Sequence, residues 1–176
     1  MRARGQTAGI ICVIVLLRAS GANAQTGEWD VSAGYVRVAD SLDLVSMHGW
    51  TAGVGIRVSP WLAIAAESDL ATHTEGDLQV RTWTLLGGPR ASVRVGPFTE
   101  FAQLAAGPAR FSSTVFGEHT AETRGALQPG AGIDIGVGRR FSARIQIDWR
   151  WITGGDFDSE DRHQIRAAAS LVYTTR

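Results

Sequence analysis

The chain has 176 residues, of which 44% are hydrophobic and 19% are charged. This composition favours one folded domain and fits neither a disordered chain nor a helical membrane protein. The 17 basic residues are all arginines and balance 17 acidic residues, so the formal net charge is zero and no basic footprint for nucleic acid is present.

The first 24 residues have the pattern of an export signal. Arg2 and Arg4 make a basic start, residues 9–17 (GIICVIVLL) form a short apolar run, and residues 22–24 (ANA) are the small-x-small motif that signal peptidase needs. The alternative, an N-terminal anchor helix, needs about 20 apolar residues. We therefore expect residues 1–24 to be a signal peptide that is cleaved after Ala24, and residues 25–176 to form the mature domain.

Cleavage at this position would change the charge and the redox chemistry of the chain. It would remove three arginines and no acidic residue, so the formal net charge would fall from zero to −3. It would also remove Cys12, the one cysteine of the sequence. The mature chain must therefore be stabilised by something other than disulfides.

From Trp29 onward the hydrophobic residues recur with a period of two, which predicts strands. Eight segments show this alternation, and their length of about ten residues is what a tilted strand needs to cross a bilayer. The fifth segment is less regular because Glu100 and Gln103 have opposite parity, which predicts a bulge or an exposed strand end. In chain order the segments are 29–35, 49–58, 62–67, 82–95, 98–108, 127–137, 141–151 and 164–173.

The connections between these segments alternate between short and long. Tight turns are expected at 59–60, 95–97 and 138–140. Polar loops of about ten residues, a length typical of outer-membrane barrels, are expected near 39–47, 70–79, 111–123 and 152–163. Short turns at one end and long loops at the other are the pattern of such barrels. The sequence therefore predicts an all-β fold, an eight-stranded antiparallel up-and-down transmembrane β-barrel with both termini in the periplasm.

The two faces of the strands distinguish a membrane barrel from a soluble one, because a membrane barrel is apolar outside and polar inside. Aromatic residues lie near the strand ends of the apolar face, as the two interfaces of a bilayer favour. A soluble barrel gives no reason for tryptophan on an exposed face. The expected belts are Trp29, Phe98, Phe141 and Tyr173 at one level and Trp50, Trp83, Trp149 and Trp151 at the other.

The polar face is rich in glycine and in charges of both signs, which suits a narrow interior that side chains fill. We expect its charged members to form an arginine–carboxylate network in the lumen. A barrel of eight strands is just wide enough to be filled, so a diffusion pore is not expected. The predicted network consists of Arg57, Glu67, Arg90, Arg94, Asp134, Arg144, Asp148, Arg150 and Arg166.

Three stretches resemble the OmpA-like, opacity-protein-like family of small outer-membrane barrels. They are GWTAGVGIRVSPWLAIAAESD (49–69), TWTLLGGPRASVRVGPFTEFAQLAAGPAR (82–110) and GAGIDIGVGRRFSARIQIDWR (130–150). The resemblance covers nearly all of the mature chain. It implies the barrel fold, the outer membrane, insertion by the barrel-assembly machinery, and a role in adhesion or envelope integrity.

No catalytic motif is present, so we expect neither an enzyme nor a cofactor. Lipid A deacylases, which are eight-stranded barrels, place a serine two residues after a histidine, whereas Gln164 and Ile165 follow His163. An EF-hand loop has glycine at its sixth position and glutamate at its twelfth. Counted from the start of the acidic run 156–161 (DFDSED), these positions are Asp161 and Ala167, which favours a solvated loop over a calcium site.

The four histidines lie one in, or at the edge of, each expected long loop. Imidazoles and carboxylates that converge at a barrel mouth would suit Zn²⁺ or a similar ion. The simpler interpretation, which we favour, is that a membrane barrel excludes histidine from its lipid face and leaves it to the loops. The candidate metal ligands are His48, His73, His119 and His163.

The leading functional hypothesis is a structural outer-membrane barrel with a filled lumen and four acidic extracellular loops, which serves surface interaction or envelope integrity. The alternative is a small-ligand or metal-ion-binding barrel that uses the mouth or the arginine-lined lumen. A lipid-modifying enzyme is a third hypothesis. The expected partners are outer-membrane lipids, with no nucleic acid and a monomeric state, and the sequence does not identify an extracellular partner.

Overall fold

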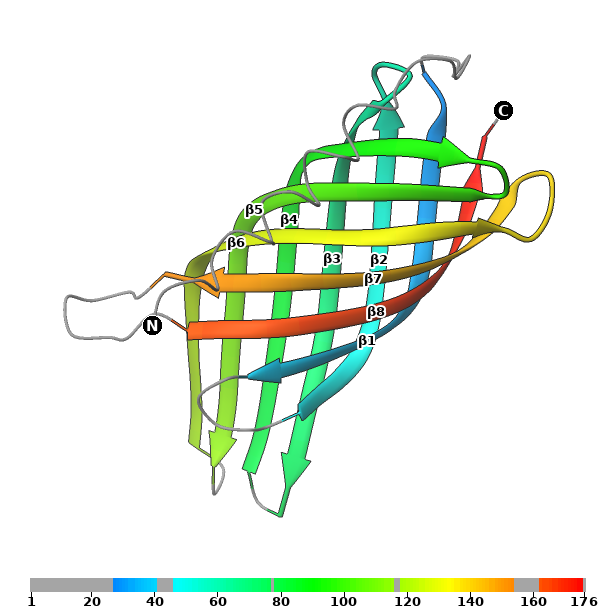
Figure 1. Cartoon of the computed structure of the whole chain (residues 1–176). Coiled ribbons are helices and arrows are strands. Elements are labelled where there is room, and N and C mark those ends of the chain that lie inside the picture. Colours follow the sequence, from blue (N-terminus) through cyan, green and yellow to red (C-terminus); the bar gives the residue numbers. More distant parts are fainter. Residues whose placement is uncertain (1–26, 41–45, 77, 116–117, 154–161, 176) are drawn as a thin grey trace, which may run out of the picture.

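The computed structural model describes residues 27–40, 46–76, 78–115, 118–153 and 162–175, which form one closed antiparallel barrel of eight strands (Figure 1). Each strand pairs with its neighbours in the sequence, and β8 pairs with β1, which confirms the predicted topology. Within the described ranges, no helix is long and apolar enough to span a membrane. The strands are β1 (Trp29–Asp40), β2 (Ser46–Arg57), β3 (Leu62–Glu75), β4 (Leu78–Val95), β5 (Phe98–Val115), β6 (Glu118–Gly136), β7 (Phe141–Ile152) and β8 (Arg162–Thr174).

The start of β1 and the end of β8 lie at the same end of the barrel, since Asp30 is opposite Thr174. The short β2–β3, β4–β5 and β6–β7 turns are at this end, which we call the terminal end, and the opposite end is the distal end. Gly96 in the β4–β5 turn has a φ of 62°, a left-handed conformation that glycine adopts without steric cost. The tight turns predicted from the sequence are therefore confirmed.

The predictions of long loops at 70–79 and 111–123 are wrong. Most of 70–79 and of 111–123 is strand, because β3 continues to Glu75 and β5 continues to Val115, each followed almost at once by the next strand. Threonine occurs in both stretches, and it is compatible with strands although it is polar. In both stretches the strands therefore continue to pair although their sequence no longer alternates between hydrophobic and polar residues.

These longer strands make the barrel asymmetric. Strands β4, β5 and β6 have 18, 18 and 19 residues, whereas β1, β2 and β7 have 12 each. The pairing of β2 with β3 ends at Thr72, and the pairing of β6 with β7 begins at Ala126. Beyond these points β3 to β6 continue as a four-stranded sheet that projects past the other strands (Figure 1). We call it the distal sheet.

Several predictions fall on residues outside the described ranges. They include the signal peptide at 1–24 with its cleavage site and the acidic run at 156–161. The predicted loops at 39–47 and 152–163 also lie largely outside, although β1 continues to Asp40 and β2 begins at Ser46.

The polarity of the barrel is the reverse of that of a soluble protein. On the outer face Trp50 is 72% exposed and Ile147 is 61% exposed, whereas Arg150 and Arg166 on the inner face are 0% and 1% exposed. The residues of both predicted aromatic belts lie on the outer face, and the Phe141 ring packs against Tyr173 with centroids 5.3 Å apart. The inner face is therefore a polar interior that side chains close off from solvent.

The irregular fifth segment is a continuous strand. The pairing register of β5 with β4 and with β6 is constant from Phe98 to Val115, so no bulge occurs there. Glu100 is exposed near the start of β5, and Gln103 is buried in the lumen. Of the two explanations predicted for the opposite parity, the exposed strand end is correct.

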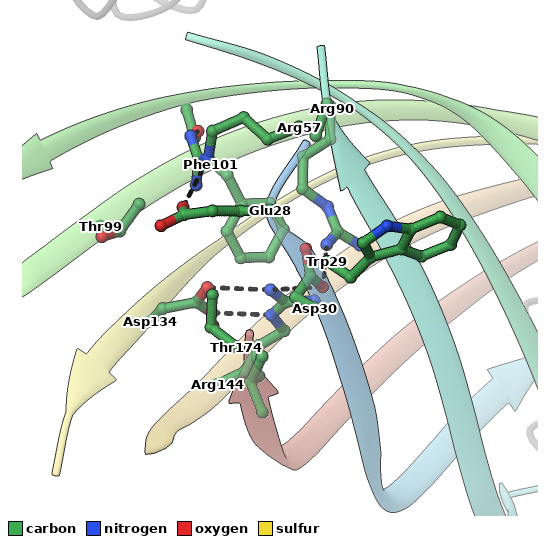
Figure 2. Close-up of a pocket in the computed structure, with 13 residues that line it drawn as sticks. Glu28, Trp29, Asp30, Arg57, Arg90, Thr99, Phe101, Asp134, Arg144 and Thr174 are labelled. Carbon is green, nitrogen blue, oxygen red and sulfur yellow. Dashed lines mark hydrogen bonds and ion pairs between the residues drawn. The ribbon is translucent and has the colours of Figure 1, made fainter. Parts of the chain in front are cut away.

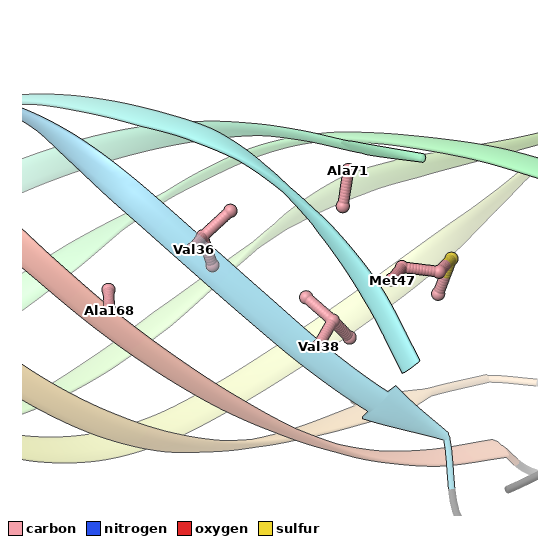
Figure 3. Packing of buried hydrophobic residues seen from close by; sticks show 5 residues of the cluster. All are labelled: Val36, Val38, Met47, Ala71 and Ala168. Atoms are coloured by element: carbon pink, nitrogen blue, oxygen red, sulfur yellow. The ribbon is translucent and has the colours of Figure 1, made fainter. Parts of the chain in front are cut away.

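Apolar side chains fill the parts of the interior that the charges do not. One cluster lies at the distal half of β1 and includes Met47 of the neighbouring strand β2 (Figure 3). A second cluster surrounds Ile152 at the end of β7. The first consists of Val36, Val38, Met47, Ala71 and Ala168, and the second of Leu86, Ala105, Ala109, Ala126 and Ile152.

Candidate functional site

The polar core of the barrel centres on Arg166 of β8. Its guanidinium donates to Asp69 of β3 from Nε and Nη2, each at 2.8 Å, and Nη1 donates to Asp148 of β7. Nη2 also donates to the Thr51 hydroxyl at 2.9 Å. One arginine therefore joins strands on opposite sides of the lumen, which a side chain of this length and donor geometry can do.

Asp69 is shared between two arginines. Besides Arg166, it accepts a hydrogen bond from Arg150 Nη2 at 2.5 Å and one from the Thr84 hydroxyl at 3.3 Å. Arg150 Nε donates to Gln128 Oε1 at 2.7 Å. Asp69 is 3% exposed, so its charge is offset by these arginines and not by water.

A second group lies around Glu67 of β3. Arg90 of β4 donates to Glu67 at 2.6 Å, and its Nε donates to Gln103 at 2.9 Å. Gln146 Nε2 lies 3.1 Å from Glu67 and 2.9 Å from Asp148. The glutamine amide thus links two carboxylates and connects this group to the one around Arg166.

Towards the terminal end the network closes around an aromatic ring. The guanidinium carbons of Arg90 and Arg144 each lie 4.9 Å from the ring centroid of Phe101, which is cation–π distance. Arg144 also binds Asp134 with two parallel hydrogen bonds of 2.7 and 2.8 Å. Figure 2 shows this group, with Asp30 beside both arginines at ion-pair distances of 3.6 and 3.8 Å.

A pocket of about 40 Å³ lies beside this stack. Its walls include Phe101 and both stacked arginines, and it reaches Glu28 and Arg57 near the end of β2 (Figure 2). A volume of this size holds a few water molecules. Asp30 Oδ1 is buried without a hydrogen bond within the described part of the chain, and water in this pocket would satisfy it.

The structure brings seven of the nine predicted network residues together. Arg57 and Arg94 are the exceptions. Arg57 lies at the terminal rim, where its Nε is 3.5 Å from Glu28, and Arg94 is exposed beside the β4–β5 turn. The joined residues are Glu67, Arg90, Asp134, Arg144, Asp148, Arg150 and Arg166.

Sequence reasoning missed several members of the network. Asp69, the residue with most arginine contacts, was omitted although it is two residues from Glu67 and therefore on the same strand face. Parity would also have identified Gln146, which lies between Arg144 and Asp148 on β7. The other omitted residues are Asp30, Thr51, Phe101, Gln103 and Gln128.

The four candidate metal ligands do not come together in the structure. His163 lies on the outer face between Trp149 and Trp151, with centroid distances of 5.7 and 5.9 Å. The other three are on other strands: His48 is exposed on β2, His73 Nδ1 is 3.2 Å from the Ser46 carbonyl, and His119 is 3.4 Å from Thr114. Among the described residues, no group of three or more His, Cys, Asp or Glu could hold a metal ion.

Comparison with known proteins gives structural matches only. No protein-family model matches the sequence, and no curated protein matches it. The attachment invasion locus protein Ail of Yersinia pestis superposes with a TM-score of 0.60 at 16% identity, over 86% of this chain and 100% of that one. Neisserial surface protein A superposes with a TM-score of 0.69 at 12% identity, over 83% and 95%.

The outer membrane protein OprG of Pseudomonas aeruginosa also matches, with a TM-score of 0.64 at 8% identity, over 86% of this chain and 97% of that one. At these identities the likeness concerns the fold. The matches extend over nearly the full length of the solved barrels, so no large part of their architecture is missing here. The chain has the fold of the small eight-stranded outer-membrane β-barrels.

Proposed function

We propose that this chain is a monomeric, non-enzymatic outer-membrane barrel that closes its lumen with ion-paired side chains and displays the distal sheet at the cell surface. The observation that carries the proposal is the apolar outer face, on which large hydrophobic residues from every strand are exposed. A soluble monomer rarely exposes an apolar patch of more than a few hundred Å². A bilayer is the environment in which such a surface is stable.

The proposed topology follows from the two ends of the barrel. Outer-membrane barrels have short turns in the periplasm and longer extensions outside. The terminal end has the short turns and the distal end has the extended strands, so the distal sheet would face the exterior. Export would use residues 1–24 as a signal peptide cleaved after Ala24, and insertion would use the barrel-assembly machinery.

The contacts in the lumen support a scaffold more than a pore or an enzyme. Arg90, Phe101 and Arg144 form a stack near the terminal end, and Arg166 joins both sides further along the lumen. The network carboxylates are paired with arginines and glutamine amides. The charges of the network therefore serve mutual pairing.

The distal sheet offers a surface for a partner. Its β6 portion, residues 118–125, pairs with β5, and on its other side the Gly125 carbonyl accepts a hydrogen bond from the Thr153 N–H at 3.0 Å. Among the described residues, no strand pairs with that other side of β6 from 118 to 123. A strand edge of this kind can accept an extended segment of another chain. Ail, which has the same fold, is an attachment invasion locus protein. We infer that this chain also acts in surface attachment, through its distal sheet.

Thiol labelling tests the topology, because the predicted mature chain has no cysteine. Thr120→Cys marks the distal sheet and Arg139→Cys marks the terminal end. A membrane-impermeant maleimide should label the Thr120→Cys variant on intact cells and the Arg139→Cys variant only after lysis. Labelling of both on intact cells would refute the topology, and recovery of the chain from the soluble periplasm would refute the membrane location.

A shortened hairpin tests the role in attachment. Removing residues 113–120 shortens β5 and β6 in register, because Ser112 lies opposite Ala121. Cells that express this variant should keep a heat-modifiable barrel and lose attachment to other cells or to matrix-coated surfaces. Attachment equal to that of cells with the full chain would exclude the distal sheet from this role. A planar-bilayer recording should show no ion conductance for either chain, since the lumen network is unchanged.

A further inference from the structure

Two arginines lie side by side on the outer face of the barrel, where the distal sheet begins. Arg81 is on β4 and Arg110 is on β5, and both are exposed. Arg81 lies opposite Ser112, so Arg110 is its diagonal neighbour across the strand pair. Diagonal neighbours are about 7–8 Å apart, which is within reach of long side chains. The two guanidinium groups can therefore approach one small anion together.

These arginines have no carboxylate partner within the described ranges. Neither Arg81 nor Arg110 has a side-chain ion pair or hydrogen bond there. Arg124 of β6 shows the contrasting case, because it binds Glu122 with two hydrogen bonds of 2.7 and 2.8 Å. These hydrogen bonds lower the pKa of the exposed Glu122 carboxyl. No described residue neutralises the charges of Arg81 and Arg110, so both can bind an outside anion.

The register separates the charges of the distal sheet between its two faces. The carboxylates Glu75, Glu118 and Glu122 have the parity of the inner face, because they share it with buried residues further along β3 and β6. The residues directly opposite the two arginines on neighbouring strands are Thr72 and Ser112 for Arg81, and Trp83 and Thr123 for Arg110. Among the described residues, the outer face around Arg81 and Arg110 therefore combines two guanidinium groups with three hydroxyls and no acid.

Trp83 fixes the height of this group relative to the membrane. It is 41% exposed on the outer face, in the proposed outer belt, and its Nε1 donates to the Ser68 hydroxyl at 3.1 Å. Tryptophan prefers the membrane interface. Arg81 is two residues further towards the distal end of β4, about 7 Å along a strand. This places the two arginines at the level of the lipid headgroups of the outer leaflet.

We propose that Arg81 and Arg110 bind a phosphate group of lipopolysaccharide, the phosphorylated glycolipid of the outer leaflet, with Thr72, Ser112 and Thr123 as additional donors. Guanidinium groups bind phosphate oxygens with paired, charge-assisted hydrogen bonds, and hydroxyls complete such sites. The site continues the lipid-facing surface of the barrel, which favours a lipid headgroup over a soluble anion. The orientation of the distal sheet in this proposal rests on the proposed function.

The test is binding of lipopolysaccharide to the purified, refolded chain in zwitterionic detergent, measured by native mass spectrometry. The double variant R81S/R110S should bind about tenfold more weakly, the loss expected when charge-assisted contacts of this kind are removed. The matched control R139S/R140S removes the same charge from the terminal end and should bind as the unchanged chain does. R81K/R110K should bind with intermediate strength, because lysine keeps the positive charge but lacks the paired N–H donors of the planar guanidinium group.

Three results would overturn the site. The first is equal binding by R81S/R110S and R139S/R140S when both migrate as heat-modifiable barrels. The second is undiminished binding of a dephosphorylated glycolipid, and the third is equal competition by phosphatidylglycerol. If R81S/R110S does not fold, the comparison of R81K/R110K with the unchanged chain decides, and equal affinity refutes the bidentate contact. Labelling of Arg139→Cys but not of Thr120→Cys on intact cells would refute the proposed topology. The binding measured in detergent tests the anion site independently of that topology.

Discussion

Replacing Asp69 with alanine should destabilise the barrel by about 3–5 kcal/mol, the cost of removing one partner from a buried ion pair. The structure favours the upper part of this range. Asp69 accepts hydrogen bonds from both Arg166 and Arg150, which are 1% and 0% exposed, so its loss leaves two buried cations short of a partner. Folded domains are stable by only about 5–15 kcal/mol, so the loss is a large fraction of the total.

Urea unfolding of the refolded barrel, followed by its heat-modifiable gel mobility and by tryptophan fluorescence, measures this effect. Asp69→Asn should be milder than Asp69→Ala, because one acceptor oxygen of similar position remains. Glu122→Ala is the matched control. It removes a carboxylate that also binds an arginine with two hydrogen bonds, but on an exposed part of the distal sheet, where an ion pair contributes little.

The reasoning would be refuted if Asp69→Ala and Glu122→Ala shifted the urea midpoint equally and slightly. That outcome would mean that water or a rearranged glutamine replaces the carboxylate without cost, and that the lumen is wetter than its contacts show. A variant that no longer assembles at all would agree with the expected size of the effect. In that case Asp69→Asn supplies the measurable intermediate.

Three further substitutions probe the same interior, each by urea unfolding. Asp148→Ala should destabilise the barrel by about 3–5 kcal/mol, because Asp148 is buried against a lumen arginine, and far more than Asp158→Ala in the acidic run; equal small effects would contradict this pairing. Gly130→Val should be destabilising because a Cβ on Gly130 would collide with the Asp148 carboxylate, and unchanged stability would show that this side chain can move aside. Phe101→Ala should cost about 3–5 kcal/mol and loosen Arg144, which would appear as faster unfolding; a loss well below 1 kcal/mol would mean that the ring is not packed.

The barrel could be predicted from the sequence because its two solvents impose one simple rule. Lipid outside and a polar interior require every second residue of each strand to be apolar. The rule operates only where the outer face meets lipid. Beyond Leu70 on β3 the outward residues are Thr72 and Thr74, and the alternation disappears although both pair with β4. The strands of the distal sheet are therefore predicted as loops, because backbone pairing by itself produces no alternating hydrophobic pattern in the sequence.

The sequence predicts most of the charged residues that form the lumen network, but not which of them pair with each other. Parity identified the arginines that line the lumen, because a buried guanidinium on a strand has only the inner face available. Parity does not show how far a side chain reaches across the barrel. Arg166 of β8 binds Asp69 of β3, a pairing between strands that are not neighbours. Arg57 has the right parity, but it lies at the terminal rim and pairs with Glu28 there.

A second pattern in the sequence becomes visible once the register is known. Three lumen carboxylates each lie directly opposite an inward glycine on the neighbouring strand, and a Cβ on that glycine would meet the carboxylate side chain. The interior of an eight-stranded barrel has little spare volume, so a charged side chain that points across it needs an empty position beside it. The glycines of the inner face therefore leave the space into which the carboxylate side chains extend to reach the arginines. The positions of these glycines thus help to determine the geometry of the network. The pairs are Gly55 with Asp30, Gly53 with Glu67, and Gly130 with Asp148.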